Sequence, residues 1–343
     1  MNRSFASDNY APVAPEILAA LGEANHGDAP AYGGDPWTRR AIERFRAEFG
    51  AATDVYFTFN GTGANVVALA ALLRPWQSAL VPASAHLQTD ECAAFERFTG
   101  SKMIPIPTAD GKLRRADLEP YVQGAGVVHF PQPRVVSISQ ATEYGGLYEP
   151  AEIRTLCEFA HAHGLAVHVD GARLANAAAA LETTLRALTV DLGVDVLTFG
   201  GTKNGLMFGE AICFFDPGLH AGAAGYVRKQ AMQLASKMRY VAAQFDRLLD
   251  TELWRSHAAH SNAMAAELLE RVRRIEGIAV TRPAPCNAIF ATMERGAIER
   301  ARAEFDFYTF DELRPEVRWM THWATQEGDV EAFASCLRRA VAG

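Results

Sequence analysis

Several short apolar runs in this sequence end in residues that could do chemistry. Lys203 lies in the glycine-rich turn that follows the apolar run 194–199. Lysines are usually found on solvated surfaces, but a lysine buried at a strand end can lose its proton and attack an aldehyde. Taken alone, Lys203 is more commonly interpreted as an ordinary lysine of a surface loop.

A second run, 165–169, leads into Asp170 and the sequence Asp-Gly-Ala-Arg, which ends at Arg173. A carboxylate at the end of a buried strand is costly to desolvate unless it has a partner. A protonated pyridine nitrogen is such a partner, and Asp170 would then keep that aromatic ring electron-withdrawing. Arg173 could reach the same crevice. The alternative interpretation of Asp170 is a helix cap.

Two further sites precede these in the chain. The turn 60–65 (NGTGAN) follows the apolar run 55–59 and opens a helical pattern, where backbone N–H groups and the Thr62 hydroxyl could bind an anion. It lacks the last glycine of a dinucleotide fingerprint and the lysine of a P-loop, and an ordinary tight turn is the alternative. His86 follows the run 78–85 and could stack on an aromatic cofactor, move protons or be structural.

The elements that must position these residues alternate between strands and helices. Between residues 55 and 216, apolar runs precede helical patterns, which predicts an α/β domain with a mostly parallel central sheet and helices on both faces. After residue 217, long helical periodicity and then short strands predict a smaller C-terminal α+β domain. We expect an N-terminal arm at 1–15, a large domain at 16–245 and a small domain at 246–343. Strands are expected at 55–59, 79–82, 127–130, 135–139, 165–169, 194–199, 212–215, 278–281, 288–292 and 317–321, and helices at 64–73, 88–97, 150–163, 173–181 and 328–342.

The order of the four sites narrows the chemistry. Ligands of open α/β sheets bind at the carboxyl ends of the strands. An anion-binding turn, then a histidine, then Asp170, then Lys203 is the order of pyridoxal 5′-phosphate (PLP) enzymes of the aspartate-aminotransferase fold. The sequence therefore predicts a PLP enzyme in which Lys203 forms a Schiff base with the cofactor.

Composition excludes several other classes. The 343 residues are 49% hydrophobic and carry a net charge of −7, with no basic cluster typical of a nucleic-acid-binding protein. The longest apolar stretch, 66–73, is too short to span a membrane, and the N-terminus lacks the apolar core of a secretory signal. Five cysteines without a C-x-x-C motif favour reduced thiols in a cytoplasmic protein, and no metal site is expected.

Longer motifs resemble the L-threonine aldolase family, in the β-eliminating lyase group, over nearly the whole chain. Its N-terminal Ser-Asp motif resembles Ser7 and the next residue, and its Tyr-Gly-x-Asp-Pro loop resembles 32–36. The 60–65 turn, His86, His129, the Asp-Gly-Ala-Arg motif, Lys203 and a C-terminal arginine at Arg318 follow in the expected order. The resemblance implies the PLP-dependent transferase-like fold (type I) and retro-aldol cleavage of L-threonine or L-allo-threonine to glycine and acetaldehyde.

The resemblance also implies a role for each matching residue. Lys203 would hold the cofactor, Asp170 its pyridine nitrogen, Gly61 and Thr62 its phosphate, and His86 would stack on its ring. Arg173 would bind the ring oxygen or the substrate carboxylate, Ser7 and Arg318 would bind that carboxylate, and Tyr32 would reach a neighbouring subunit's site. The base that takes the β-hydroxyl proton is left open between His86, His129 and a water molecule.

Two segments depart from the family pattern. The segment 233–239 (QLASKMR) replaces a glycine-rich one, so that Arg228, Lys229, Lys237 and Arg239 are all candidates for a phosphate contact across a dimer. The segment 140–146 differs from the usual Glu-Asn-Thr and bears on substrate preference. A phenylserine-type aldolase, another β-eliminating lyase and a non-catalytic PLP-fold protein are the alternatives. The family implies a homotetramer, built as a dimer of dimers.

Overall fold

The predicted alternation of elements forms a seven-stranded sheet in the order β1-β7-β6-β5-β4-β2-β3. In the computed structural model, which describes residues 4–343, strands β2 to β6 run parallel, and β7 is antiparallel to both β1 and β6. The mixed α/β class with a mostly parallel sheet is therefore confirmed. The strands are β1 (Asp54–Thr58), β2 (Gln77–Pro82), β3 (Lys102–Ile106), β4 (Gln132–Ser139), β5 (Ala166–Gly171), β6 (Val196–Gly200) and β7 (Glu210–Phe214).

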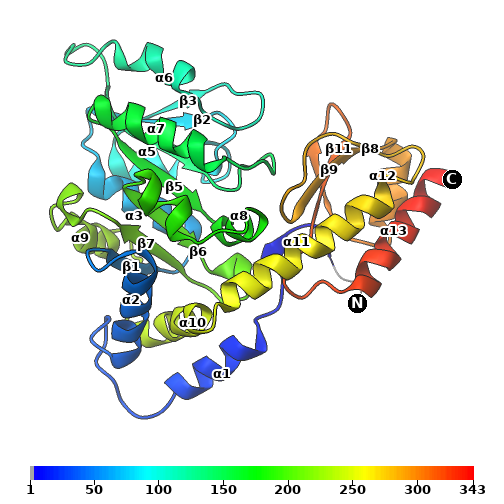
Figure 1. The fold of residues 1–343 in the computed structure, drawn as a ribbon, viewed down its shortest axis with the longest axis horizontal. Helices are drawn as coiled ribbons and strands as arrows, with labels where there is room; N and C mark the ends of the chain where they lie inside the picture. The colour runs from blue at the N-terminus through cyan, green and yellow to red at the C-terminus, as the bar shows by residue number, and fades with distance from the viewer. Residues whose placement is uncertain (1–3) are drawn as a thin grey trace.

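Helices cover both faces of this sheet (Figure 1). Side chains alternate along a strand, so Leu197 and Phe199 join one core cluster while Val196 joins the cluster on the opposite face. On the first face lie α2 (Pro36–Phe49), α6 (Arg115–Val122), α7 (Pro150–Ala162), α8 (Leu174–Ala180) and α10 (Met238–Asp250). On the other lie α3 (Gly61–Leu72), α5 (Ala94–Thr99) and α9 (Ala223–Gln230).

The long helix α11 (Leu253–Val272) leads from the large domain to the small one, as Figure 1 shows. There a four-stranded antiparallel sheet, in the order β10-β11-β9-β8, packs against two further helices and the C-terminal part of α11. This is the expected smaller α+β domain. Its elements are β8 (Ala279–Val280), β9 (Ala288–Thr292), α12 (Arg295–Arg302), β10 (Tyr308–Asp311), β11 (Glu316–Met320) and α13 (Glu327–Ala342).

The N-terminal segment packs on the small domain before the chain enters α1 (Pro15–Ala24). The ring of Phe5 stacks on that of Phe333 with centroids 4.1 Å apart, and its carbonyl accepts a hydrogen bond of 2.8 Å from the Met320 N–H. The expected domain limits remain predictions. Residues 1–3 of the expected arm lie outside the described residues, and the 245/246 limit falls inside α10.

Two expected elements are wrong in detail. Residues 127–130 form an exposed turn rather than a strand, because the side-chain amide of Gln132 donates to the carbonyls of Val127 and Phe130 and folds the segment back on itself. The helix expected at 88–97 is split into α4 (His86–Thr89) and α5, because Cys92 and Ala93 take positive φ angles of 51° and 56°.

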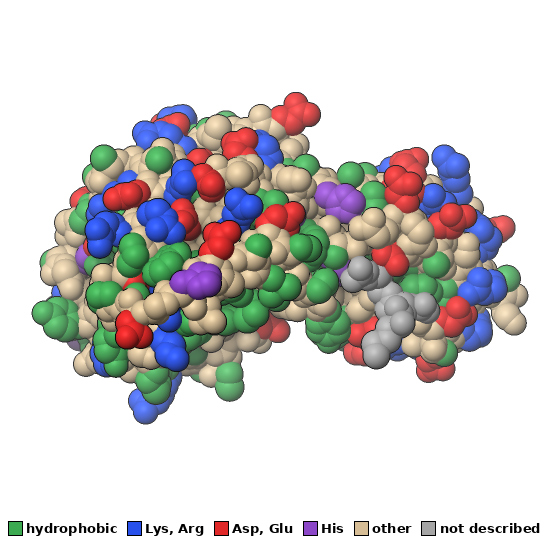
Figure 2. Space-filling view, turned by 90° about the horizontal axis from the view of Figure 1, so that it is seen from below, with side chains coloured by type: hydrophobic (Ala, Val, Ile, Leu, Met, Phe, Trp, Pro, Cys, Tyr) green, Lys and Arg blue, Asp and Glu red, His purple; other side chains and the backbone are tan. Residues whose placement is uncertain are grey.

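Figure 2 shows the two domains as lobes joined across a narrower waist, with basic side chains interspersed among acidic ones on the face that it presents. Within residues 4–343, we find no helix long and apolar enough to cross a membrane.

Candidate active site

A cavity of about 1080 Å³ lies where the carboxyl ends of the large-domain strands face the small domain. Parallel strands bring their carboxyl ends to one edge, so residues far apart in sequence meet there. Seven of the site residues predicted from the sequence line this cavity, namely Ser7, Gly61, His86, Asp170, Arg173, Lys203 and Arg318. Glu210, which was not predicted, also lines it.

Asp170 lies at the end of β5 with both carboxylate oxygens bound. One oxygen accepts from the Asn65 amide at 2.9 Å, and the other accepts from the Ala172 N–H at 3.0 Å. Burial by itself would raise the pKa of Asp170, but these hydrogen bonds and the nearby His168 and Lys203 bring the net pKa below its usual value. Because the N-cap of α8 is Arg173, Asp170 is not the helix cap that we considered as its alternative.

Lys203 lies in the short 3-10 turn Thr202–Asn204 that follows β6. Burial lowers the pKa of its amine, and the positive charge of Arg173 lowers it further. This environment favours the neutral, nucleophilic amine, in contrast to a lysine of a surface loop.

Glu210, the first residue of β7, is a buried carboxyl beside this lysine. Its Oε2 accepts a hydrogen bond of 3.0 Å from the Gly201 N–H. Burial raises the pKa of Glu210 to about 7, while the Thr202 hydroxyl and Lys203 oppose that rise. Sequence reasoning did not single out Glu210, and no motif that we recognised pointed to it.

Two carboxylates that sequence reasoning also missed hold His86. Its Nδ1 lies 2.8 Å from Oε1 of Glu91, and its backbone N–H donates to Oε1 of Glu143 at 3.0 Å. The pKa of His86 is raised, chiefly by the hydrogen bond to Glu91, although burial and Lys203 oppose the rise. His86 thus presents a positioned imidazole to the cavity.

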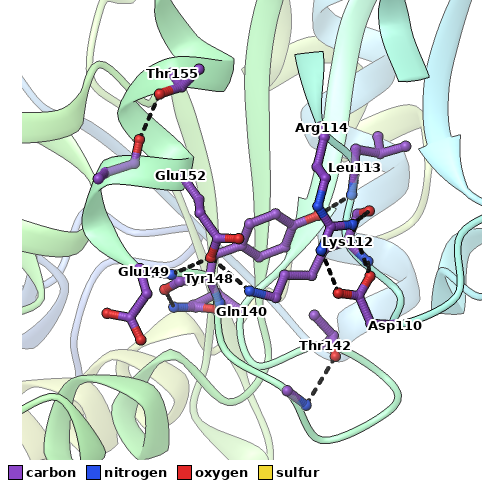
Figure 3. Close-up of polar contacts among 12 residues, drawn as sticks. Asp110, Lys112, Leu113, Arg114, Gln140, Thr142, Tyr148, Glu149, Glu152 and Thr155 are labelled. Atoms are coloured by element: carbon purple, nitrogen blue, oxygen red, sulfur yellow. Dashed lines mark hydrogen bonds and ion pairs between the residues drawn. The ribbon is translucent and has the colours of Figure 1, made fainter. Parts of the chain in front are cut away.

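The loop that carries Glu143 is itself held from behind (Figure 3). The side chain of Gln140 binds both the N–H and the carbonyl of Tyr148, at 3.0 and 2.9 Å. The Tyr148 hydroxyl accepts from the Leu113 N–H at 2.6 Å, and Thr142 binds the Gly146 N–H at 3.1 Å. The departure from the family pattern at 140–146 therefore forms an ordered wall of the site.

Arg173 is bound by the N-terminal segment. Its Nε and Nη2 donate to the two carboxylate oxygens of Asp8 at 2.7 and 2.9 Å. Burial would raise the pKa of Asp8, but the charges of Arg173 and Lys203 hold it well below its usual value. This bidentate pair uses the guanidinium edge that a substrate carboxylate would need.

Arg318 reaches the cavity from β11 of the small domain. Its Nε is buried and finds no hydrogen-bond partner in residues 4–343. Its guanidinium lies 5.7 Å from the centroid of the Tyr308 ring. Ser7, whose hydroxyl oxygen accepts a bond of 3.2 Å from the Asn9 N–H, lines the same cavity. A buried donor without a partner indicates a place for a ligand acceptor.

The turn at the start of α3 is open to the cavity at Gly61 and covered by the side chain of Gln233 at Gly63. A Cβ on Gly61 would meet no atom of the described chain within 4 Å, and this residue lines the cavity. A Cβ on Gly63 would lie 2.3 Å from Cδ of Gln233, so only glycine leaves room for that side chain. Thr62 is half-buried in the same turn but is not among the residues that line the cavity.

The single chain does not bring all candidates together. His129 lies in the exposed turn at 127–130, and Tyr32 is 54% exposed with Lys229 over its ring; neither lines the cavity. Arg228 donates to the Phe57 carbonyl and Arg239 to that of Gly27. The roles of these residues, and of the exposed Lys237, at a neighbouring subunit's site remain predictions.

Comparisons with known proteins agree with this geometry. Residues 4–295 match the family model described as β-eliminating lyase. Low specificity L-threonine aldolases of a Pseudomonas species and of Pseudomonas aeruginosa are each 43% identical to this chain, over 98% of it and 97% of their own length. A solved structure of Leishmania major threonine aldolase superimposes with a TM-score of 0.93 at 32% identity, covering 98% of this chain and 99% of that one.

A solved aspartate aminotransferase from Thermus thermophilus shares the fold with a TM-score of 0.69 at 16% identity, covering 99% of this chain and 92% of its own. The fold and the strand-end site define a protein of the PLP-dependent transferase-like class. Within that class, the chain belongs to the β-eliminating lyase family.

Family and fold imply PLP, and the cavity fits it. Lys203 offers a buried amine with a lowered pKa, and Asp170 offers an ionised carboxylate at a strand end. The open side of the Gly61 turn, at the N-terminus of α3, suits a phosphate. These are complementary to an aldehyde, a pyridinium nitrogen and an anion, respectively.

Proposed function

We propose that this chain is a low-specificity L-threonine aldolase that cleaves L-threonine and L-allo-threonine into glycine and acetaldehyde. The observation that carries the proposal is the meeting of Lys203, Asp170, His86 and Arg318 around one cavity, with the buried Nε of Arg318 left without a hydrogen-bond partner among residues 4–343. The names of the Pseudomonas and Leishmania relatives support the same reaction.

The residues divide the work as follows. Lys203 would hold PLP covalently, Asp170 would bind its pyridine nitrogen, and Gly61 with Thr62 would bind its phosphate. When bound, the cofactor would withdraw the electrons of the substrate's Cα–Cβ bond. Arg318, with Ser7, would fix the substrate carboxylate and thereby orient that bond.

His86 is the better candidate for the base that takes the β-hydroxyl proton. It lines the cavity and carries a carboxylate partner on Nδ1 at 2.8 Å, whereas His129 is exposed and outside the cavity in the single chain. General-base catalysis requires the acceptor within hydrogen-bonding reach of the proton.

The ion pair with Asp8 supports a role for Arg173 other than binding the ring oxygen or the substrate carboxylate. Because Asp8 occupies its fork, Arg173 would anchor the N-terminal segment beside the cavity, and its charge would act on Lys203 at a distance. The carboxylate site would then depend on Arg318.

An aromatic β-hydroxy amino acid is a second candidate substrate. The cavity includes the aromatic residues Tyr308 and Phe310 in its wall, which could contact an aromatic side chain. The same catalytic residues would release an aromatic aldehyde from phenylserine.

We propose a homotetramer, a dimer of dimers, as the assembly. Large apolar side chains are exposed near the Gly61 turn and α9, where a neighbouring subunit could cover them and where Tyr32 and Lys229 also lie. The exposed apolar residues are Phe59, Tyr226 and Met232.

We also propose a cytoplasmic location. All five cysteines are free thiols in the structure, four of them buried, which suits a reducing compartment.

The test is aldehyde release by purified protein with added PLP, from L-threonine, L-allo-threonine and L-phenylserine in parallel. Release from the aliphatic pair supports the proposal, and release from phenylserine alone selects the aromatic candidate. Lys203→Ala should abolish both turnover and the long-wavelength absorbance of the bound cofactor. The matched control is Lys102→Ala, which changes an exposed lysine of β3 and should preserve both. An undiminished rate in Lys203→Ala would sink the mechanism.

A further inference from the structure

Glu91 is a carboxylate enclosed by protein at the edge of the cavity. Its side chain has no exposed area, and Oε1 accepts two hydrogen bonds, from the Asn65 amide at 2.9 Å and from His86 Nδ1 at 2.8 Å. The chain turns sharply after it, with positive φ at Cys92 and Ala93, and this turn directs Glu91 inward between α4 and α5. Two left-handed residues in succession are uncommon and indicate a backbone held by its surroundings.

Asn65 joins Glu91 to the residue expected to bind the cofactor nitrogen. Its amide nitrogen donates one hydrogen to Glu91 and the other to Asp170, each at 2.9 Å. Its Oδ1 accepts from the Thr198 hydroxyl, also at 2.9 Å. The amide is therefore fully bound and holds two buried carboxylates in fixed positions.

The arrangement around His86 resembles a carboxylate–imidazole pair of an acid–base catalyst. With Nδ1 engaged by Glu91, the proton-accepting nitrogen left for a ligand is Nε2. Four charged or titratable groups besides Glu91 surround this histidine: Asp90 next to Glu91, Asp170 on β5, Glu143 after β4 and Lys203 after β6. Of these, Asp170 favours the charged imidazole and Lys203 disfavours it.

We propose that Glu91 is a positioning residue that fixes the tautomer of His86 and stabilises its charged form during proton transfer. This inference rests on the proposed aldolase function. His86 Nε2 takes the β-hydroxyl proton; the O–H electron pair forms the carbonyl bond of the aldehyde, and the Cα–Cβ pair passes to the cofactor. The proton then leaves Nε2 for water, Cα takes a proton from water so that the Cα–Cβ pair becomes the new C–H bond of glycine, and Glu91 keeps its own charge throughout.

Glu91→Gln separates charge from position. The glutamine oxygen can still accept from Nδ1 and from Asn65, so the imidazole stays in place while the negative charge is lost. The charged form of His86 should then titrate at lower pH than in the wild type. A role limited to packing or to holding the ring would leave that titration unchanged.

The measurement is deuterium exchange at the imidazole C2 position, followed by mass spectrometry of the His86 peptide across pH. It needs no turnover, and it is made on the full chain both with and without PLP. The wild type should show a midpoint above the ordinary 6.5 without PLP, and Glu91→Gln should move the midpoint down in both states. An unmoved His86 midpoint in a folded Glu91→Gln protein overturns the proposal. If that variant does not fold, a wild-type midpoint at or below 6.5 overturns it and a higher one supports it.

Asp195→Asn is the matched control. Asp195 lies 2.9 Å from Nε2 of His161, away from the cavity, so the same change from carboxylate to amide beside a different histidine should leave the His86 midpoint and the rate unmoved. In turnover, Glu91→Gln should lower kcat/KM about 10- to 100-fold, by analogy with carboxylates that orient metal-bound histidines. The pH profile should follow the exchange midpoint. If none of the three substrates yields aldehyde, the proposed function fails, while the exchange data still decide whether Glu91 sets the charge of His86.

Discussion

The two walls of the cavity differ in how their charged groups are satisfied. On the large-domain wall, Asp170 binds Asn65, Arg173 binds Asp8, and His86 binds Glu91, each at 2.9 Å or less. On the small-domain wall, Arg318 presents a buried Nε that has no partner among the described residues. The large-domain wall also buries two acceptors without a partner among the described residues, Oε2 of Glu91 and Oε2 of Glu143. The contrast therefore concerns the two arginines: Arg173 is paired within the protein, whereas Arg318 keeps a donor open to a ligand acceptor. We expect Arg173 to stabilise the fold and Arg318 to bind substrate.

The largest effect is expected from breaking the ion pair between Asp8 and Arg173 on the large-domain wall. Asp8→Asn leaves the buried charge of Arg173 without its counter-ion, which should lower the free energy of unfolding by about 3–5 kcal/mol. Urea unfolding at pH 7 measures this. In the wild type, the lowered pKa of Asp8 means that the stabilisation is present above its unfolded value of 3.8 and is lost as pH falls below that value.

The control for this variant is Asp306→Asn. Asp306 is an exposed residue of the small domain whose carboxylate accepts a hydrogen bond from the hydroxyl of Ser4, in the N-terminal segment. Its change to asparagine should alter the free energy of unfolding by no more than about 0.5 kcal/mol. Equal losses in the two variants would mean that burial of the Asp8–Arg173 pair does not matter.

Glu210 differs from Asp8 and Asp170 of the same wall, because burial raises the pKa of its carboxyl from 4.5 to about 7, whereas the pKa values of the two aspartates are lowered. Its folded form prefers the proton, so the cofactor-free wild type should lose stability as pH rises from 4.5 to 7. Glu210→Gln should remove that loss and, at pH 8, stabilise the protein by up to about 3 kcal/mol. Unfolding at pH 5 and pH 8 tests this, with the exposed Glu119→Gln as control. The same pH dependence in both variants contradicts the assignment.

Changing Arg318 on the small-domain wall should affect catalysis rather than the stability of the fold. Arg318→Gln should lower kcat/KM about 100-fold, close to 3 kcal/mol, through the loss of charged hydrogen bonds to the substrate carboxylate. The melting temperature should hold or rise, since a buried donor without a partner is removed. If the Arg318→Gln protein is much less stable but has normal kcat/KM, Arg318 stabilises the fold and does not bind substrate.

The smallest effect on kcat/KM is expected from removing the hydrogen bond between Tyr10 and Tyr308. The hydroxyls of Tyr10 and Tyr308 lie 2.8 Å apart and link the N-terminal segment to β10. Tyr308→Phe and Tyr10→Phe should each change kcat/KM by threefold or less, about 0.5 kcal/mol, because an exposed neutral hydrogen bond contributes little. A clearly larger loss for Tyr308→Phe alone would assign Tyr308 a contact with substrate.

The sequence predicted the parts of the site that stand at strand ends. Lys203 and Asp170 follow apolar runs long enough to be read as strands, and the fold then brings them together. It did not reveal Glu91 or Glu210, because a glutamate within a helical or turn pattern is usually solvated, and burial depends on contacts distant in sequence. Asp8 was noted only as part of a motif, since an ion pair with Arg173 cannot be inferred from spacing.

Fold prediction failed for similar reasons. The apolar run 127–130 was read as a strand, but hydrogen bonds from the Gln132 side chain hold it as a turn. The short edge strands β3 and β10 were not predicted; β3 contains Pro105, which weakens the strand pattern, and β10 spans only Tyr308–Asp311. The 88–97 helix is split by positive φ angles at Cys92 and Ala93. These angles could not be predicted, because neither residue type favours the left-handed region.

The docking of the N-terminal segment has a consequence for biosynthesis. Asp8 can bind Arg173 once about half of the chain has been made, but Phe5 can pack on Phe333 only after the small domain has been synthesised. The cavity, which also needs Arg318, is therefore completed late in synthesis, however early the central sheet forms. A purification tag is better joined to the C-terminus, at the exposed end of α13, than to the segment that closes the site.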